Sequence, residues 1–265
     1  MEVLLDQARQ EGIKVSYDMY PYTAGSTTLS VTLPPWVLEG GVTAALERLR
    51  DAKVRVSMAR DIQNGIPGWD NIIKFAGFDQ IIITSVRTGP NQECIGKTLT
   101  EIAAARRQDP FETVFDLLLA EELKVGMIDY YGNEEHIIRL LQRPEANLCT
   151  DGLPGGRPHP RIYGAFPRLL GRFVRSLKAL SLEEAIYKMT GKAASVFQLS
   201  DRGVIKEGNR ADLVIFNPEM ITDTGTYDDP RHFPEGISQV LINGAVVLDN
   251  GERGKELSGQ VLRWI

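Results

Sequence analysis

The stretch from Cys149 to Arg161 constrains the fold of this chain more than any other. A short apolar run at 146–149 stops abruptly at Asp151, and the glycines and prolines that follow predict a loop. A helix is expected next, at about 165–176. In α/β enzymes, a carboxylate at the carboxyl end of a strand often belongs to the active site. The simpler alternative is that Asp151 caps a turn and that Arg161 is a solvated cation.

Helices and strands alternate before this stretch. Asp109-Pro110 has the residue types of a helix N-terminus, with an acidic N-cap and a proline in the first turn. Thr98 and Ser181 each start the pattern of a capping box, with a glutamate three residues later. The expected elements are a helix at 109–122, a strand at 125–130, a helix at 134–142 and a strand at 146–149. This order predicts parallel strands joined by crossover helices.

The two ends of the chain show different patterns. A helix at 2–11 and a strand at 13–20 lead into a loop rich in hydroxyl groups. Near the other end, apolar runs flank Asn243-Gly244, which is a strong hairpin signal. A last apolar run at 261–265 closes the chain.

These patterns divide the chain into regions. We expect an α/β region at 1–199 and a small β module at 200–265. Within the first region, the helix that starts at Ser181 is expected to run to about residue 197. Residues 36–97 are less regular, so we expect an insertion or a small subdomain there.

The composition argues against several classes of protein. A formal net charge of −5 argues against a nucleic-acid partner, because phosphate binding needs a basic surface. No run approaches the roughly 18 apolar residues of a membrane helix, and the first residues lack the basic start of a signal peptide. Cys94 and Cys149 are the only cysteines, so a disulfide framework is not expected and the predicted location is the cytoplasm.

Several segments together resemble the C-terminal part of the D-aminoacylases (N-acyl-D-amino-acid deacylases) of the amidohydrolase superfamily. They recur in order over nearly the whole chain. The segments are 18–27 (DMYPYTAGST), 33–36 (LPPW), 150–152 (TDG), 159–168 (HPRIYGAFPR), 183–190 (EEAIYKMT) and 201–212. The last of them alone would indicate only the superfamily.

The resemblance implies a fold and a chemistry. The fold would be α/β: the C-terminal part of a (β/α)8 TIM-type barrel with an inserted small region, plus a C-terminal β-sandwich module. The enzyme would hold one tightly bound zinc and often a second, weaker metal ion. A metal ion lowers the pKa of bound water from about 15.7 toward about 7, which makes hydroxide available at neutral pH. The substrate would be a small molecule, an N-acyl-D-amino acid, with its amide carbonyl attacked by this water.

The resemblance also implies roles for individual residues. Asp151 would be the general base and a ligand of the weaker metal site. Arg161 would pair with the substrate α-carboxylate, which a guanidinium can bind in a bidentate manner. Tyr20 and Ser26 would add hydrogen bonds to the same carboxylate. His159 is expected to order the loop.

The same resemblance bears on the substrate side chain. Relatives that prefer acidic substrates carry a further arginine shortly after the hydroxyl-rich loop. Residues 28–36 contain no arginine, which favours neutral or apolar D-amino acids.

The chain departs from the family in its histidines. The superfamily supplies tight-zinc ligands from a His-x-His motif and from further histidines, but this sequence has only His136, His159 and His232. A catalytic zinc site needs about three protein ligands. We therefore expect the tight-zinc ligands to lie on a missing N-terminal part, and the partner to be an N-terminal half polypeptide. Self-association is the alternative, because half a barrel exposes strand edges.

Two other functions stay open. The chain could be a catalytically inactive assembly or regulatory module of the same fold. It could also catalyse another amidohydrolase reaction, such as ring opening of the dihydropyrimidinase type, although the loop at 20–28 and His159-Pro160-Arg161 argue against this.

Overall fold

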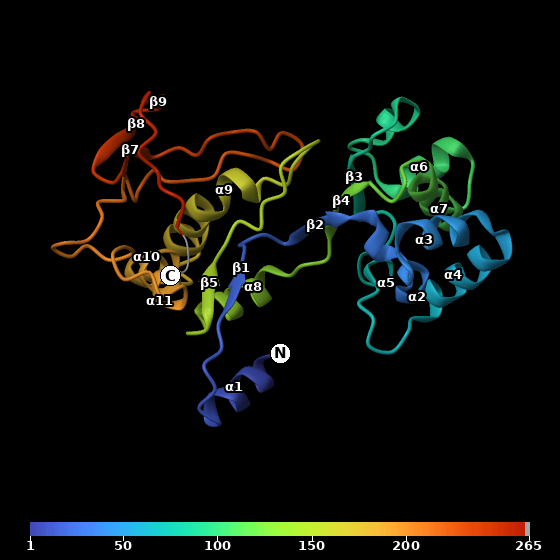
Figure 1. Cartoon of the computed structure of the whole chain (residues 1–265), viewed down its shortest axis with the longest axis horizontal. Helices are drawn as coiled ribbons and strands as arrows, with labels where there is room; N and C mark the ends of the chain where they lie inside the picture. The colour runs from blue at the N-terminus through green and yellow to red at the C-terminus, as the bar shows by residue number, and fades with distance from the viewer. Residues whose placement is uncertain (263–265) are drawn as a thin grey trace. The chain divides into compact units, whose positions relative to one another are not determined.

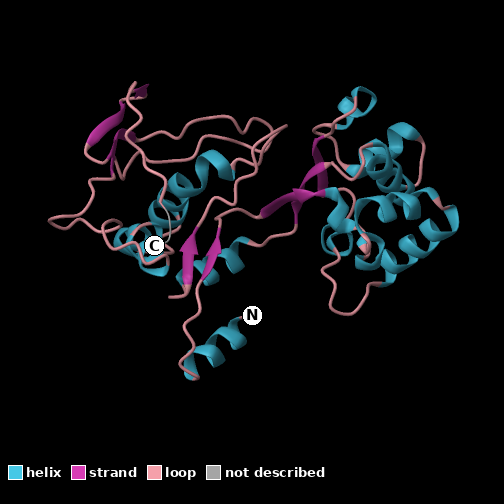
Figure 2. Ribbon diagram, in the orientation of Figure 1, coloured by secondary structure: helices cyan, strands magenta, loops and turns pink. Residues whose placement is uncertain are grey.

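The structure is a computed structural model that describes residues 1–262. It divides into two compact units, which we describe separately (Figures 1 and 2). Unit 1 comprises Met1–Pro21, Glu135–Asp151 and the described part of Pro160–Ile265, and unit 2 comprises Tyr22–Glu134 and Gly152–His159. Unit 2 includes the predicted insertion at 36–97 and extends beyond it. The predicted domain limits, 1–199 and 200–265, stay a prediction.

Unit 1 contains helices, a parallel strand pair and an antiparallel sheet. Its elements are α1 (Glu2–Gln10), β1 (Tyr17–Met19), α8 (Glu134–Gln142), β5 (Ala146–Leu148), α9 (Arg161–Arg168), the π-helix η3 (Leu169–Ser176), α10 (Leu182–Met189), α11 (Gly191–Val196), β6 (Leu213–Phe216), β7 (Ile237–Ile242), β8 (Ala245–Asp249) and β9 (Glu252–Arg253).

The strands β1 and β5 form a parallel pair, with Tyr17 opposite Ala146 and Met19 opposite Leu148. The side chain of Leu148 packs with α8, η3 and α10 in a core to which Ile137, Leu141, Leu169, Phe173 and Ala185 contribute. Because the two strands run in the same direction, their carboxyl ends come to one edge of the sheet. Tyr20 and Asp151, which follow these ends, are thereby brought to the same edge.

The C-terminal sheet of unit 1 is antiparallel, in the order β6-β7-β8-β9. Asn243 and Gly244 connect β7 to β8 with φ of 51° and 84°. Two consecutive residues with positive φ are the requirement of the tight turn that the Asn-Gly pair predicts. The hairpin is confirmed, whereas residues 263–265 of the predicted last strand lie outside the described residues.

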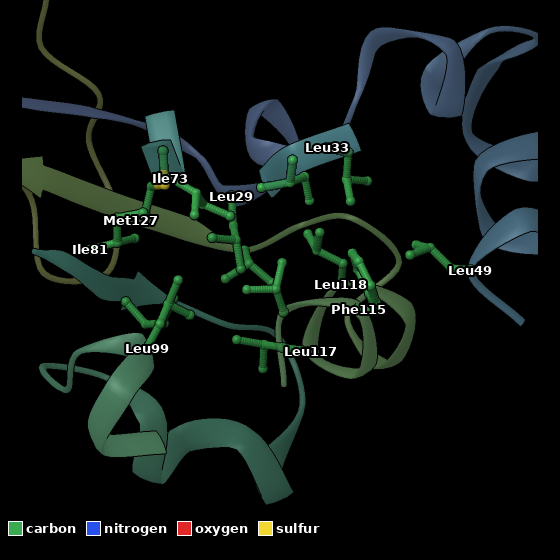
Figure 3. Packing of buried hydrophobic residues seen from close by; sticks show 14 of the residues in the cluster. Leu29, Leu33, Leu49, Ile73, Ile81, Leu99, Phe115, Leu117, Leu118 and Met127 are labelled. Carbon is green, nitrogen blue, oxygen red and sulfur yellow. The ribbon is translucent and has the colours of Figure 1, made fainter. Parts of the chain in front are cut away.

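Unit 2 packs helices against a three-stranded antiparallel sheet. Its elements are β2 (Ala24–Thr28), η1 (Leu29–Thr32), α2 (Pro35–Leu38), α3 (Gly41–Arg50), α4 (Ala52–Asn64), α5 (Ile72–Ala76), β3 (Ile81–Ser85), η2 (Gly89–Cys94), α6 (Leu99–Arg106), α7 (Pro110–Ala120) and β4 (Gly126–Tyr130). The core lies between α7 and the sheet, with Leu29, Phe115, Leu118 and Met127 at its centre (Figure 3).

One predicted strand pairing is wrong. The strand at 126–130, β4, lies between β2 and β3 and is antiparallel to both. The parallel partner of β5 is instead β1, far upstream in the chain. The order of elements along a chain does not reveal which strand edges meet, because pairing depends on where the intervening segment folds. Here the intervening segment forms the sheet and the core of unit 2.

Two predicted helices differ in extent from those in the structure. The helix expected at 165–176 begins earlier, at Arg161, and continues as the π-helix η3 from Leu169. The helix expected from Ser181 to residue 197 is interrupted at Thr190, whose φ of −131° and ψ of −89° are not helical.

Three predicted helix starts are confirmed. Thr98 and Ser181 each form a complete capping box, with Glu101 and Glu184 respectively. The carboxylate of Asp109 accepts hydrogen bonds from the backbone at the start of α7. Within residues 1–262, no helix combines the length and the apolar character needed to cross a membrane.

Candidate functional site

The central contact of the candidate site is an ion pair between Asp151 and Arg161. Asp151 follows β5 with a φ of 43°, and Arg161 is the first residue of α9. Their closest atoms, Oδ2 of Asp151 and a terminal guanidinium nitrogen of Arg161, are 2.8 Å apart. The side chain of Arg161 is only 1% exposed, whereas that of Asp151 is 60% exposed. The pair therefore joins a buried cation to a carboxylate that solvent can reach.

Tyr20 completes this group in unit 1. The central carbon of the Arg161 guanidinium lies 4.3 Å from the centre of the Tyr20 ring, which is a cation–π contact. The resemblance predicts a hydrogen bond from Tyr20 to a substrate, and the stacking of its ring on Arg161 is new from the structure. The structure thus brings three of the predicted residues together, from the ends of two adjacent strands and the start of one helix.

His159 and Ser26 lie in unit 2 and are described there. The Nε2 of the buried His159 ring is 3.0 Å from the Ala24 carbonyl oxygen, and its ring meets that of Tyr22 edge to face at 5.0 Å. His159 therefore holds its loop against the start of β2, which agrees with the ordering role that we expected. Ser26 lies on β2 opposite Ile128 of β4.

Cys149 lies between β5 and Asp151. Its backbone N–H donates to the Met19 carbonyl oxygen at 3.0 Å, which extends the pairing with β1. Burial raises the pKa of the Cys149 thiol, and the charges of Asp18 and Asp151 add to this effect against the opposing Arg161. A thiol with a raised pKa stays protonated at neutral pH and is a poor nucleophile.

A second polar group connects β1, β5 and α11. Asn147 donates from Nδ2 to Oδ1 of Asp18 at 3.0 Å, and Lys192 Nζ donates to Oδ1 of Asn147 at 2.9 Å. Burial lowers the pKa of Lys192, while the nearby charges of Glu145 and Asp18 oppose that effect. Asp18 and Asn147 alternate with Met19 and Leu148, so they lie on the face of the strand pair opposite to α8, η3 and α10. No pattern in the sequence predicts this group, because its members are scattered along the chain.

The described residues do not by themselves fit a zinc site. Across residues 1–262, no group of three or more histidine, cysteine, aspartate or glutamate side chains is placed to hold a metal ion. His136 is exposed on α8, and His232 contacts Oδ2 of Asp229 at 2.7 Å. A catalytic zinc needs about three protein ligands. The ligand that the candidate site contributes is the Asp151 carboxylate.

Arg168 was not among the predicted site residues. Its Nε donates to the carbonyl oxygen of Pro21 at 2.8 Å, and a terminal nitrogen lies 3.1 Å from Oδ2 of Asp223. One signal in the sequence could have indicated it: Arg161, Arg168 and Arg175 recur every seven residues. On a helix this spacing is close to two turns, so the side chains share a face.

A largely apolar cavity of about 980 Å³ lies elsewhere in unit 1. Its lining includes Leu170, Ile186, Val204, Phe216 and Ile237, and does not include Asp151, Arg161 or Tyr20. The polar candidate site is therefore distinct from this cavity.

Comparison with known proteins gives a consistent result. A profile of the amidohydrolase family matches residues 87–248, which is more than half of the chain. A D-aminoacylase from Alcaligenes xylosoxydans xylosoxydans is 34% identical over 256 residues, covering 96% of this chain and 42% of that protein.

Two solved structures are similar over most of the chain. One is N-acyl-D-glutamate deacylase from Bordetella bronchiseptica with zinc and a phosphonate inhibitor, at 32% identity and a TM-score of 0.70, covering 94% of this chain and 44% of that one. The other is a D-aminoacylase with a binuclear metal centre, at 31% identity and a TM-score of 0.72, covering 96% and 44%. The chain thus spans less than half the length of these relatives. It belongs to the amidohydrolase family, and over nearly its whole length it is similar to D-aminoacylases and other N-acyl-D-amino-acid deacylases.

Proposed function

We propose that this chain is the C-terminal part of an enzyme that hydrolyses the amide bond of N-acyl-D-amino acids, giving a carboxylate and a D-amino acid. The observation that carries the proposal is the Asp151–Arg161 pair at the carboxyl end of β5. A buried guanidinium next to an accessible carboxylate supplies both a receptor for an anionic substrate and a group that can accept a proton.

In this proposal Arg161 binds the α-carboxylate of the substrate. Its guanidinium already binds a carboxylate oxygen at 2.8 Å in the structure. Because Arg161 is almost fully buried, its interaction with an anion is weakly screened. Tyr20 supports the guanidinium from one side, and Tyr20 and Ser26 add hydrogen bonds to the same carboxylate. The lack of arginine at 28–36 favours neutral or apolar substrate side chains.

Asp151 is the proposed general base. Its exposed carboxylate can reach a substrate, and carboxylates serve as general bases when held near the reacting atoms. Zinc, when bound to the complete enzyme, supplies hydroxide at neutral pH. Asp151 takes the proton of the nucleophile and passes it to the leaving amine, and it is also the proposed ligand of the weaker of one or two metal positions.

The tight-zinc ligands are proposed to lie on an N-terminal part of the enzyme that this chain does not include. Two observations support this division of the enzyme. The chain spans 42% of the D-aminoacylase that it matches, and its parallel sheet has only β1 and β5 among residues 1–262. Parallel sheets that small are not stable alone. An N-terminal half polypeptide would add strands to the β1–β5 pair and so extend it toward a TIM-type barrel. It would likewise extend the antiparallel sheet toward a β-sandwich. Self-association is the alternative.

A catalytically inactive assembly module is the second candidate. It is favoured by the lack, within the part of the chain that the structure describes, of a group of side chains able to hold a metal ion.

The test combines metal analysis with activity. We expect the chain to co-purify with a polypeptide that carries a His-x-His motif, and the complex to contain about one or two zinc ions. The complex should release D-amino acids from N-acetyl-D-amino acids. Asp151→Asn should lower kcat at least about 10²-fold, because general acid–base catalysis contributes about 10²–10⁴. Asp249→Asn, at an exposed carboxylate of β8, is the matched control and should leave kcat unchanged.

Two outcomes would contradict the proposed enzymatic function. Absence of both metal and companion would support the inactive module. An active complex in which Asp151→Asn retains full kcat would remove Asp151 from the proposed chemistry.

A further inference from the structure

Three arginines spaced by seven residues lie along the helix formed by α9 and η3. Arg161 binds the end of β5, whereas Arg168 and Arg175 both bind the segment 218–223. Arg161 pairs with Asp151, Arg168 binds the Pro21 carbonyl oxygen and Asp223, and Arg175 binds the carbonyl oxygens of Pro218 and Ile221 at 3.0 and 2.7 Å. The second arginine, Arg168, reaches the backbone that follows β1.

Arg168 contacts the backbone immediately next to Tyr20. Its Nε donates to the carbonyl oxygen of Pro21 at 2.8 Å. Tyr20 precedes this proline, and its ring covers the Arg161 guanidinium at 4.3 Å. The proline ring fixes its own φ, so a bond to its carbonyl restricts the direction in which the adjoining backbone leaves β1. The placement of the Tyr20 ring thus depends on a contact made two helical turns away from Arg161.

The other partner of Arg168 is itself held firmly. Segment 218–223 packs so closely on η3 that a Cβ added to Gly171 would lie 2.6 Å from the Ile221 carbonyl oxygen. Arg175 binds the same segment through two carbonyl oxygens. Asp223, whose side chain is 11% exposed, therefore presents its carboxylate to Arg168 from a fixed position.

We propose that Arg168 is a positioning residue that holds Tyr20 against the Arg161 guanidinium and thereby orients Arg161 for a substrate carboxylate. The carboxylate part of this inference rests on the proposed function, whereas the Tyr20–Arg161 contact does not. A guanidinium binds a carboxylate through two parallel hydrogen bonds only when its plane is correctly oriented. A ring stacked on that plane limits its rotation. Without Arg168, Tyr20 and Pro21 would lose the hydrogen bond that fixes them relative to α9.

The first test measures the Tyr20–Arg161 contact directly. In the full chain, NMR signals of the Arg161 side chain should show a ring-current shift that disappears in Tyr20→Leu. We expect Arg168→Met to remove this shift and Arg175→Met to retain it. Arg175 is the matched control, because it lies on the same helix and binds the same segment, but its hydrogen bonds go to Pro218 and Ile221. Retention of the shift in Arg168→Met would overturn the proposal.

The second test measures carboxylate recognition. N-acetyl-D-alanine and its primary amide are titrated into the full chain and followed by NMR. Arg168→Met should weaken binding of the acid about 10-fold, as expected for partial loss of a charge-assisted hydrogen bond, and change binding of the amide little. Combining it with Tyr20→Leu should add no further loss, because residues that act through one contact are not additive. Arg168→Lys should recover part of the affinity.

The variants separate the two proposals. If Arg161→Met leaves binding of the acid unchanged, Arg161 is not the carboxylate receptor and the proposed function loses its support. If the unaltered chain does not bind the acid, the ring-current test alone decides the positioning role. If Arg161→Met abolishes binding but Arg168→Met binds like the unaltered chain, the positioning role is wrong and the proposed function stands. If Arg168→Met and Arg175→Met weaken binding of the acid equally, the effect is a general one on stability. This result would also overturn the positioning role.

Discussion

At the scale of single residues, buried charge in this chain is matched by donors that are distant in sequence. Glu121 follows α7 and is 1% exposed. It accepts hydrogen bonds from the backbone N–H groups of Arg87 and Thr88 and from Nδ2 of Asn91, at 2.5, 3.0 and 2.6 Å, and from the Thr88 hydroxyl. Burial by itself raises the pKa of Glu121, but these hydrogen bonds outweigh it and the pKa lies below 4.5.

Glu121→Gln should destabilise unit 2 in a pH-dependent way. At pH 7 we expect a loss of about 2–3 kcal/mol in the free energy of unfolding, because an amide group would face donors that now bind a carboxylate. The folded-state pKa is lowered, so the contribution of Glu121 is complete above its ordinary pKa of 4.5 and is lost as the pH falls through the folded value. The difference between the two proteins in urea unfolding should therefore shrink below about pH 4.

The neighbouring Glu122 is the matched control for this prediction. It forms an exposed ion pair with Arg87 at 3.0 Å. Exposed pairs contribute about 0–1 kcal/mol, so Glu122→Gln should change little at any pH. Equal effects of the two substitutions would show that the Glu121 network does not stabilise the fold.

At the scale of elements, the helix of α9 and η3 shows how tertiary contact alters local structure. The sequence predicts a helix in this region, but not the change to π-helical backbone at Leu169. Gly171, in the π-helical part, allows the helix to approach the backbone of Ile221 and Thr222. π-Helical backbone is rare and occurs mostly as single turns, whereas here it runs over eight residues. The hydrogen bonds of Arg168, just before this segment, and of Arg175 within it join the helix to the segment 218–223.

Gly171→Ala should destabilise unit 1 although alanine favours helices. In an exposed helix the change would stabilise by about 1 kcal/mol. At position 171, however, the added Cβ would lie 2.6 Å from the Ile221 carbonyl oxygen, so the backbone must move. Such overpacking costs about 1–3 kcal/mol, and we expect a net loss in thermal unfolding. Gly89→Ala is the control, since its Cβ would meet nothing within 4 Å. A more stable Gly171→Ala protein would argue against the close packing.

At the scale of the whole molecule, unit 2 has a core of its own. The buried residues of this core all come from 29–127, so its contacts do not require unit 1. In sequence, unit 2 interrupts unit 1 between β1 and its parallel partner β5. The two units are therefore expected to differ in how far each can fold alone.

An excised segment of residues 22–134 should fold independently. We expect a cooperative urea transition and a defined near-ultraviolet circular dichroism signal, because the segment retains the whole core of unit 2. Leu118→Ala, at a fully buried position, should lower the stability of the segment by about 2–5 kcal/mol. A gradual transition that Leu118→Ala does not shift would show that the core depends on the rest of the chain.

The sequence by itself determined the features that depend on neighbours in the chain. Both capping boxes, the Asp109 N-cap and the hairpin at Asn243-Gly244 were predicted correctly. Each of these uses hydrogen bonds or backbone angles within about four residues, so the residue types alone specify them. The amidohydrolase resemblance was also visible in the sequence, from short segments recurring in order, and the comparisons confirm it.

Only the tertiary structure decided the features that join distant parts of the chain. The pairing of β1 with β5, the antiparallel place of β4, and the contacts of Arg161 with Tyr20 and of Arg168 with Pro21 are of this kind. Residue types do not specify such partners, because many strand edges and carbonyl oxygens would serve equally well. The choice among them is made by the packing of the whole unit, where burial of apolar surface outweighs any single hydrogen bond.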